Sequence, residues 1–265
     1  MKDEAGCVIV AGHPRSGTTL FQRLCDGHPQ MRITNELGNF YYLGRLYPDY
    51  ARMMLRRWRY VRDKWAFDVR YADLHQNSRQ NLWLVLRFLA KMARFWRRRI
   101  GTAEVTAVLR GLFPGTAVVG DKLPHYWIKL PALTQAEYVK CIFLYRDCRD
   151  VTSSFLQQAR TNWQNRPWIH RINTADKIAA RWVDTIEMME RFAGQLHVIR
   201  YEQLAQAPEP TLASLSTFLG VDAAGFDGSM VSGDSIGKYR QGLASDELQT
   251  VMDIAGPTMA RLGYG

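Results

Sequence analysis

The stretch Cys7-Val8-Ile9-Val10-Ala11-Gly12-His13-Pro14-Arg15-Ser16-Gly17-Thr18-Thr19 decides the fold of this chain. Its first six residues are small or apolar and rich in β-branched side chains, as in a buried parallel strand. A loop with Pro, Ser and Gly follows. Residues 18–25 then have the pattern of a helix, which Asp26-Gly27-His28-Pro29 ends. Strand, loop and helix in this order predict the first βα unit of an α/β sheet.

Similar patterns along the chain extend this prediction. Apolar runs at residues 117–120, 138–145 and 196–200 predict further strands, and helices are expected near 149–160, 175–193 and 209–219. Residues 41–110 have long helical patterns and no strong strand. Strands that alternate with helices favour a parallel sheet covered on both faces. We expect an α/β fold, a P-loop-containing parallel sheet flanked by helices, as a single domain over residues 1–265 with a helical insertion at about 41–110.

The loop after the first strand has the frame G-x-x-x-x-G-x-T from Gly12 to Thr19. This frame matches the phosphate-binding loop of nucleotide hydrolases except that Thr18 occupies the lysine position. Its glycines let backbone N–H groups point inward, and the helix start adds a positive dipole end, so the loop predicts an anion site. Arg15 can supply the missing cation. A nucleoside triphosphatase also needs a carboxylate for Mg²⁺ near a strand end, and the sequence offers no convincing candidate.

A second anion site is predicted after the strand that ends at Tyr145. Arg146 follows this strand at the carboxyl end, where open α/β sheets bind ligands. In a helix that starts near Cys148, Asp150 and Ser154 share a face, so Arg146 and Ser154 can meet at one phosphate. A surface ion pair is the alternative for this segment alone. Together with the first loop, it suits a nucleotide with phosphate groups at its 5′ and 3′ ends.

Composition sets limits on the class of protein. With 265 residues and 47% hydrophobic residues, the chain can bury the core of one large domain. No stretch approaches the roughly 18 apolar residues of a membrane span, so we expect no integral membrane segment. The first residues do not resemble a signal peptide. Four cysteines (Cys7, Cys25, Cys141 and Cys148) lack metal-ligand spacing, and we favour a reduced cytosolic chain over a disulfide framework.

The net charge of +10 and the isoelectric point near 9.6 indicate an affinity for anions. The positive residues gather in two runs, Arg52 to Lys64 and Lys91 to Arg99. Such runs attract nucleic acid, a phosphorylated cofactor, an acidic peptide or an anionic membrane surface, and they are also typical of solvated helix faces. Charge alone does not decide between these readings.

Residues 14–20 and 146–154 resemble the 5′-phosphosulfate and 3′-phosphate motifs of sulfotransferases that use 3′-phosphoadenylyl sulfate (PAPS). The resemblance is closest to the tyrosylprotein sulfotransferase branch and its bacterial relatives. It extends to residues 24–32, Asn35-Glu36 and residues 120–124, 200–204 and 259–264. These segments touch most of the chain outside about 40–115.

The resemblance implies an enzyme of the EC 2.8.2 type, in which an acceptor oxygen attacks sulfur in line with the leaving 5′-phosphate. Glu36 would be the general base, and Arg15 and Lys122 would stabilise negative charge on the transferred group. His125, close to Lys122, is an alternative base. Positioning and charge stabilisation should dominate such catalysis.

The resemblance also implies the contacts of PAPS and of its product 3′,5′-ADP, and it requires no metal. Backbone N–H groups of Ser16, Gly17, Thr18 and Thr19, with the two threonine hydroxyls, would hold the 5′-phosphosulfate. Arg146 and Ser154 would hold the 3′-phosphate. Tyr201 and Lys238 are further expected cofactor contacts.

The acceptor is open at this stage. Tyrosine of a peptide or protein is the first expectation, and a carbohydrate or lipid hydroxyl is the alternative. A P-loop kinase and a nucleic-acid-binding protein are the competing classes, and nucleic acid is not an expected partner. The animal tyrosylprotein enzymes would carry a membrane anchor and luminal disulfides, so we expect a cytoplasmic chain of bacterial type, with an excised luminal domain as the alternative. A homodimer is compatible with these expectations.

Overall fold

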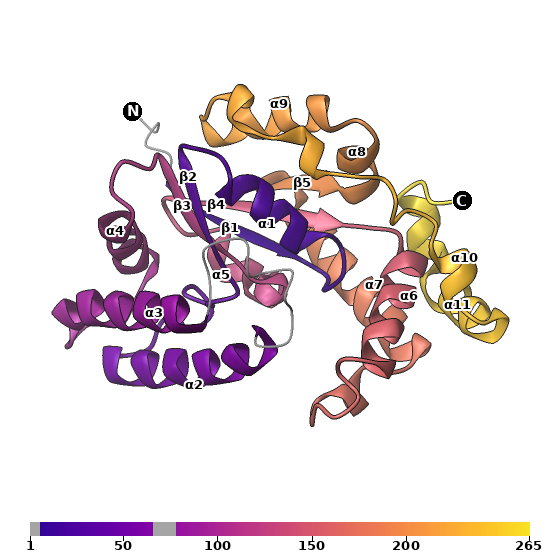
Figure 1. Cartoon of the computed structure of the whole chain (residues 1–265), viewed down its shortest axis with the longest axis horizontal. Helices are drawn as coiled ribbons and strands as arrows, with labels where there is room; N and C mark the ends of the chain where they lie inside the picture. Colours follow the sequence, from indigo (N-terminus) through magenta and orange to yellow (C-terminus); the bar gives the residue numbers. More distant parts are fainter. Residues whose placement is uncertain (1–5, 66–77) are drawn as a thin grey trace.

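The computed structural model describes residues 6–65 and 78–265, and it contains a parallel sheet of five strands. The strands are β1 (Cys7–Gly12), β2 (Met31–Asn35), β3 (Val118–Lys122), β4 (Val139–Tyr145) and β5 (Leu196–Arg200), in the spatial order β2-β3-β1-β4-β5. This confirms the predicted α/β fold (Figure 1). The beginning of the chain, residues 1–5, and part of the expected insertion, residues 66–77, lie outside the described residues.

The helices are numbered, like the strands, in the order of the chain. They are α1 (Thr18–Asp26), α2 (Tyr47–Trp65), α3 (Ser78–Met92), α4 (Thr102–Leu112), α5 (Leu130–Leu133), α6 (Cys148–Arg160), α7 (Ala175–Arg191), α8 (Tyr201–Gln206), α9 (Pro208–Leu219), α10 (Tyr239–Gly242) and α11 (Ser245–Arg261). Short 3₁₀ helices include η2 (Ala93–Phe95) and η3 (Pro124–Lys129). None of the helices within the described ranges is both long enough and apolar enough to cross a membrane.

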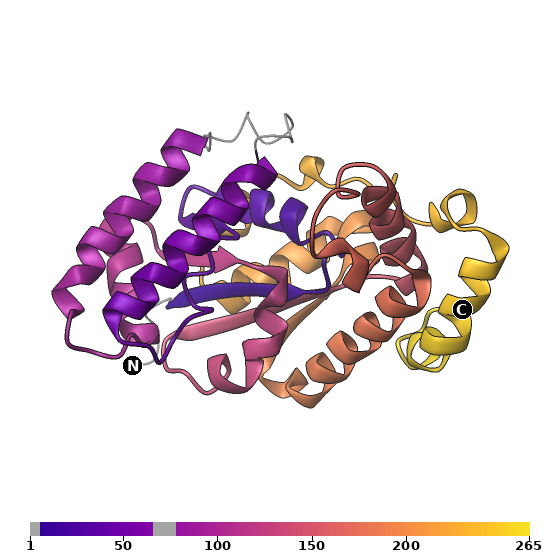
Figure 2. The same cartoon turned by 90° about the horizontal axis from the view of Figure 1, so that it is seen from below.

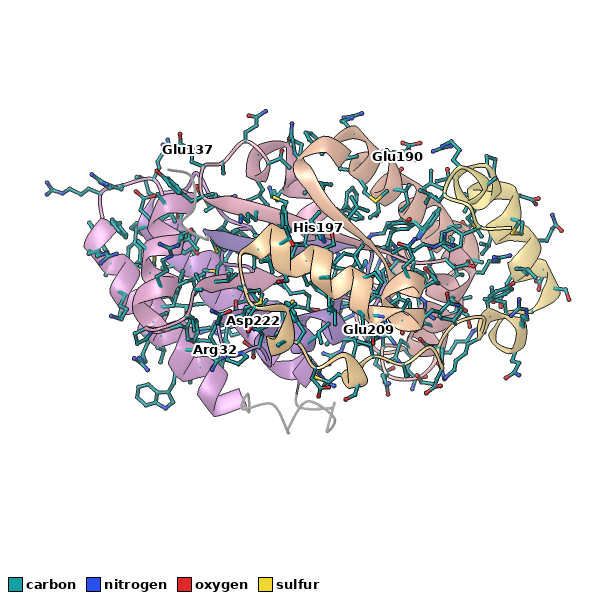
Figure 3. The ribbon with its side chains drawn as sticks, turned by 90° about the horizontal axis from the view of Figure 1, so that it is seen from above. Arg32, Glu137, Glu190, His197, Glu209 and Asp222 are labelled. Carbon is teal, nitrogen blue, oxygen red and sulfur yellow. The ribbon has the colours of Figure 1, made fainter. Side chains whose placement is uncertain are left out.

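Alternate residues of the central strand enter different cores, because successive side chains of a strand point to opposite faces. Val8 and Val10 pack with Phe21 of α1 and Leu215 of α9 on one face of the sheet. Figure 3 shows α9 lying across this face, where His197 of β5 stacks on the ring of Phe218 with centroids 4.7 Å apart.

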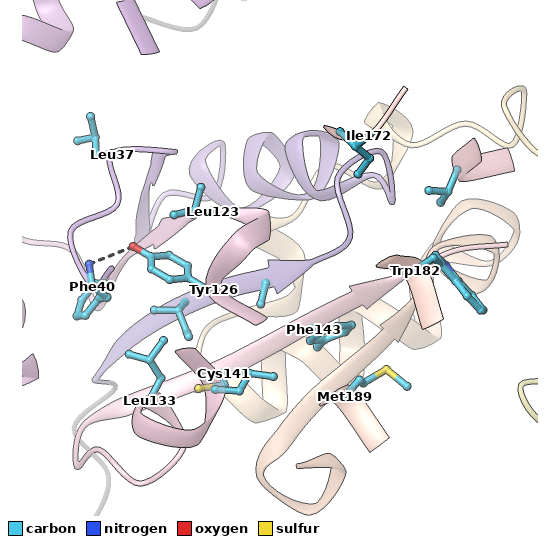
Figure 4. Packing of buried hydrophobic residues seen from close by; sticks show 14 of the residues in the cluster. Leu37, Phe40, Leu123, Tyr126, Leu133, Cys141, Phe143, Ile172, Trp182 and Met189 are labelled. Atoms are coloured by element: carbon cyan, nitrogen blue, oxygen red, sulfur yellow. Dashed lines mark hydrogen bonds between the residues drawn. The ribbon is translucent and has the colours of Figure 1, made fainter. Parts of the chain in front are cut away.

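The opposite face packs against a larger set of helices. Ile9 of β1 and Phe143 of β4 are buried there together with Trp182 and Met189 of α7 (Figure 4). Helices α2, α3 and α6 also contribute buried residues to this core. Seen from below, α2 and α3 lie at one end of the sheet and α6 and α7 at the other end (Figure 2). The four cysteines are buried and carry no disulfide, and all four are within the described residues.

Three features differ from the sequence-based expectations. The strand Met31–Asn35 was not predicted, and it pairs with β3 at the sheet edge. The third strand runs two residues past the predicted end at Gly120, so that Lys122 is the last residue of β3 rather than a loop residue after the strand. The long helix Ser245–Arg261 was also not predicted, and it packs against α7.

A buried carboxylate joins β3 to the turn that follows β2. Asp121 is fully buried and accepts hydrogen bonds from the Thr34 hydroxyl (2.7 Å), the Leu37 and Gly38 amides (3.2 and 2.8 Å) and the Tyr126 hydroxyl (2.6 Å). Burial raises the pKa of Asp121, while the hydrogen bonds from Tyr126, Thr34 and Gly38 act in the opposite direction. Tyr126 also accepts the Phe40 amide at 3.1 Å (Figure 4). This network fixes the turn after β2.

We expect Tyr126→Phe to lower the free energy of unfolding by about 1–3 kcal/mol, because a buried charged acceptor and a buried amide each lose a partner. Denaturant titration would measure this loss. Tyr42→Phe, at a half-buried tyrosine against Tyr41, is the control and should change the value by less than about 0.5 kcal/mol. Equal losses in the two variants would contradict a special role of the Tyr126 hydroxyl.

Candidate active site

The loop between β1 and α1 has the backbone geometry of an anion nest. Gly12 and Gly17 have φ values of 150° and 84°, and Arg15 has a φ of 76°, which is rare for a residue with a side chain. A β-carbon at Gly12 would lie 2.3 Å from the Leu144 carbonyl oxygen. The loop is therefore held against β4 in a conformation that glycine adopts readily and that strains the backbone at Arg15.

The helix that follows the loop presents its amino end to the same place. Because α1 begins at Thr18, the amide groups of its first turn have no acceptor within the helix. The Ser16 amide differs from our expectation: it donates to the His13 carbonyl at 3.1 Å within the loop. The hydroxyl of Ser16 is buried and finds no hydrogen-bond partner among the described residues, so Ser16 can serve an anion through Oγ rather than through N–H.

Lys122 connects this anion nest to Glu36. Its ammonium group is fully buried and donates to the Thr19 hydroxyl at 3.0 Å and to Glu36 Oε1 at 3.1 Å. The Glu36 amide donates to the Lys122 carbonyl at 2.6 Å, so the two residues are tied at the backbone as well. A buried ammonium needs such partners, because taking an unpaired charge out of water is costly. Thr19, Lys122 and Glu36, which were all expected at the site, therefore meet at one end of the sheet.

A residue of α2 that the sequence did not single out supports Glu36. Glu36 has a φ of 57°, and its carbonyl accepts a hydrogen bond from Arg57 Nε at 2.9 Å. A β-carbon at Gly38 would lie 2.6 Å from the Arg57 side chain, so the turn and the guanidinium are in close contact. Arg57 stood within an arginine run, and its neighbours Arg56 and Arg59 are exposed. Helical spacing does distinguish Arg57 from them, because it lies three residues after Met54 and seven after Tyr50, on the buried side of α2.

The two expected anion sites are joined by a direct contact. Arg15 Nε donates to the Ser154 hydroxyl at 2.9 Å. Arg146 is nearly buried, makes an ion pair with Asp150 at 3.3 Å and donates from Nη2 to the Ser235 carbonyl. The structure therefore pairs Ser154 of α6 with Arg15 of the first loop. Arg146, which follows β4, contacts Asp150 of α6 and Ser235 of a later loop instead.

Tyr201 packs between the two sites. A β-carbon at Gly17 would lie 2.4 Å from Cδ2 of Tyr201, and the Arg146 guanidinium lies over the same ring at 4.5 Å. The hydroxyl of Tyr201 is 2.7 Å from Ser235 Oγ. A β-carbon at position 17 is thus disfavoured for two reasons, the left-handed backbone conformation and the contact with the tyrosine ring.

Asp150 anchors the loop that carries Lys238. Its carboxylate accepts hydrogen bonds from the Gly237 and Tyr239 amides at 2.8 and 3.0 Å, on either side of Lys238. The Lys238 side chain is exposed at the start of α10. The position of Lys238, an expected cofactor contact, is therefore fixed by the backbone on both sides of it.

Two histidines lie near the loop. Burial, followed by the positive charge of Arg181, lowers the pKa of His13 to about 3, so its ring is neutral at pH 7. The charge of His125 acts in the same direction, which places His125 near His13. His125 is half-buried in η3, three residues after Lys122.

The site has buried polar atoms that suit a polar, anionic ligand. His13 Nε2, Ser16 Oγ, Asn35 Oδ1 and Arg146 Nε are buried and have no hydrogen-bond partner within residues 6–65 and 78–265. Such atoms are uncommon in folded proteins unless water or a ligand binds them. They lie in the loop after β1, at the end of β2 and after β4, and the donors among them fit a nucleotide with two anionic groups.

A metal ion is a different matter. In the part of the chain that the structure describes, no group of three or more His, Cys, Asp and Glu side chains is arranged to hold one. The strand-end carboxylate that a kinase would need is present as Asp121, which the sequence analysis did not propose. Both of its oxygens already accept hydrogen bonds from the protein.

Comparison with solved structures gives similar folds at low sequence identity. The sulfotransferase domain from the curacin biosynthetic pathway is 16% identical, with 98% of each chain covered and a TM-score of 0.60. The sulfotransferase domain from the Synechococcus PCC 7002 olefin synthase is 19% identical, with 94% of each chain covered and a TM-score of 0.56. Mouse sulfotransferase SULT7A1, solved as a complex with PAP, is 12% identical, with 98% of this chain and 86% of that chain covered and a TM-score of 0.53.

Comparison with curated protein sequences found no significant match. A family model described as the sulfotransferase family matches residues 7–225, which is most of the chain. On the basis of this match, the chain belongs to the sulfotransferase family.

Proposed function

We propose that this protein transfers a sulfuryl group from PAPS to an acceptor hydroxyl. The observation that carries the proposal is the Thr19–Lys122–Glu36 contact, in which one buried cation touches both the phosphate nest and a carboxylate. Membership of the sulfotransferase family and the PAP complex of the mouse enzyme support it. PAP is 3′,5′-ADP, the product that PAPS would leave.

The proposed cofactor contacts follow from the two anion sites. The amides at the start of α1, with the hydroxyls of Ser16, Thr18 and Thr19, would hold the 5′-phosphosulfate. Arg146, which contacts the Ser235 carbonyl, and Ser154, which contacts Arg15, would hold the 3′-phosphate with their cationic and hydroxyl groups. Tyr201 and Lys238 would complete the nucleotide site. The contact between Arg15 and Ser154 would keep the two anion sites in register.

The chemistry assigned to the protein is proton transfer and charge stabilisation. PAPS supplies the sulfuryl group and a 5′-phosphate leaving group. Glu36 would take the acceptor's proton as its oxygen bonds to sulfur and the bond from sulfur to the 5′-phosphate breaks. Lys122 and Arg15 would stabilise the charge that accumulates on the transferred and leaving oxygens. His125 is the alternative base, and Glu36 is preferred because of its direct contact with Lys122.

The acceptor is proposed as a class. Tyrosine of an acidic peptide, as in the tyrosylprotein branch, remains the first candidate, and a carbohydrate or lipid hydroxyl is the alternative. Among the described side chains of the two arginine runs, Arg57 contacts the turn at Glu36, while the others are exposed on α2, α3, η2 and the residues after η2. The arginine runs therefore favour a peptide acceptor less than the sequence suggested.

We expect the protein to bind 3′,5′-ADP without added metal and more tightly than 5′-AMP or ATP, as measured by calorimetric titration. Arg146→Ala should weaken 3′,5′-ADP binding by about 30-fold or more, because losing one partner of a desolvated charge pair costs about 2 kcal/mol or more. Arg160→Ala is the control, at an exposed arginine that ends α6 and pairs with Glu247. Equal or tighter binding of ATP would overturn the proposed function in favour of a kinase.

Glu36→Gln should lower kcat for sulfate incorporation by about 100-fold or more, because the base is lost, and it should change the affinity for 3′,5′-ADP much less, because the glutamine carbonyl can still accept a hydrogen bond from the buried Lys122 ammonium. Transfer of radiolabelled sulfate from PAPS to acidic tyrosine peptides, sugars and lipid alcohols would identify an acceptor and measure this rate. The exposed Glu137→Gln variant should match the wild type. Full activity of Glu36→Gln would transfer the role of base to His125.

Arg57→Lys should lower kcat by about 10- to 100-fold while leaving the binding of 3′,5′-ADP unchanged, because a lysine lacks the Nε contact that holds the Glu36 carbonyl. Arg56→Lys, at the exposed neighbouring position, should have no effect. Parallel losses of nucleotide affinity and of thermal stability in Arg57→Lys would mean that the contact supports the fold and not the base.

A further inference from the structure

The whole net charge of the chain resides in two short stretches of sequence. Residues 41–60 and 82–100 contain eleven arginines and lysines and one aspartate, Asp49, which gives +10. The chain has 35 basic and 25 acidic residues, so 24 of each sign remain elsewhere and cancel. The two stretches form most of α2, α3 and η2 together with the loops that flank them.

These cations lie at the surface. All except Arg57 are exposed. Within the described residues, Arg52 pairs with Asp49 at 3.5 Å and Arg98 with Glu104 at 3.6 Å, both as surface contacts. Exposed pairs of this kind neutralise little of the field that a ligand would meet. The helices α2 and α3 pack side by side, at the end of the molecule opposite α10 and α11 (Figures 1 and 2).

Apolar side chains are exposed among the cations. On α2, Leu55 lies between Arg52, Arg56 and Arg59, at spacings that put all four on one helix face. The buried residues Tyr50 and Met54 of α2 lie on its other side. The exposed face of α2 therefore combines arginines with a leucine.

The exposed face of α3 has the same composition. Trp83 and Leu86 are 66% and 41% exposed, and Arg87 and Lys91 continue the same face by helical spacing. Val85, with others, is buried on the core side. Tryptophan and leucine beside basic residues are typical of helices that lie in the interface of a membrane.

The end of this helix pair continues the pattern. Trp96 is 59% exposed although its ring contacts Tyr47 at the start of α2, with centroids 5.5 Å apart. Leu46, which is 46% exposed, forms an isolated antiparallel β-bridge with Arg99. Five of the ten large apolar side chains exposed in the described residues thus lie on α2, α3 and this corner, which we call the basic–apolar face.

We propose that the basic–apolar face docks the protein onto an anionic lipid surface. Its leucines and tryptophans would enter the boundary between headgroups and acyl chains, while its arginines bind lipid phosphates. A nucleic acid or an acidic peptide would use the arginines, but it gives no reason for exposed leucines on both helices. A second copy of the chain is disfavoured, because two faces of charge +10 would repel each other.

The test is co-sedimentation of the whole protein with vesicles, without nucleotide. We expect binding to phosphatidylcholine vesicles that contain about a quarter phosphatidylglycerol, at least tenfold tighter than to pure phosphatidylcholine, and weaker at high salt because salt screens surface charge. Trp83→Gln with Leu86→Gln, and separately Arg56→Gln with Lys91→Gln, should each weaken binding about tenfold or more, because each pair removes one part of the interfacial interaction. Matched controls are Met252→Gln with Ile254→Gln on α11 and Arg171→Gln with Arg191→Gln.

Failure of the wild type to sediment with anionic vesicles, or equal binding by the face and control variants, would overturn the proposal. Binding to heparin or to an acidic peptide that the Trp83 and Leu86 substitutions leave unchanged, with no vesicle binding, would assign the face to an anionic macromolecule and also overturn it. Unchanged thermal unfolding would show that the variants fold. Because the assay needs no PAPS, its outcome is independent of the proposed sulfotransfer, which the 3′,5′-ADP titration tests separately.

Discussion

The burial of the Lys122 ammonium constrains the rest of the site. An ammonium removed from water must be surrounded by acceptors, and here these are the Thr19 hydroxyl and the Glu36 carboxylate. Glu36 reaches this position only because the turn after β2 passes through a left-handed residue, and Arg57 and Asp121 fix that turn from two sides. The strained turn is therefore stabilised by buried polar contacts around it.

Close contacts between side chains also join the two anion sites. The ring of Tyr201 lies against Gly17 of one site and Arg146 of the other, and Arg15 reaches across to Ser154. A ligand with anionic groups at both ends would thus contact two sites whose separation is already fixed. Preorganisation of this kind reduces the ordering cost of binding, and it explains why buried donors without partners are tolerated here.

The elements that local patterns encode could be predicted from the sequence. The continuous apolar run of β1, the glycine frame of the loop, the helix start and the strand before Arg146 were all visible. In the structure Arg15, Thr19 and Arg146 follow the carboxyl ends of parallel strands, at one end of the sheet. The strand β2 (Met31–Asn35) was missed because it is only five residues long and includes a charged arginine, so that its pattern gives a weak signal. The contact of Arg57 with Glu36 could not be predicted, because the two residues are 21 positions apart, although helical spacing puts Arg57 on the same face of α2 as the buried Tyr50 and Met54. The partners of Asp121 were hidden for the same reason.

Positive charge in this protein acts at two ranges. The site draws its cations from Lys122, which is fully buried, and from Arg146, which is nearly so, and such charges are screened little by salt. The basic–apolar face carries most of the net charge on exposed side chains, whose field decays over a Debye length of about 8 Å at physiological ionic strength. The face and the site therefore differ in how strongly salt weakens their interactions with anions. What the two share is α2, which turns Arg57 toward the backbone carbonyl of Glu36 and its other described arginines toward solvent. A single helix thus separates short-range positioning from long-range attraction, and substitutions on its two sides can be interpreted independently.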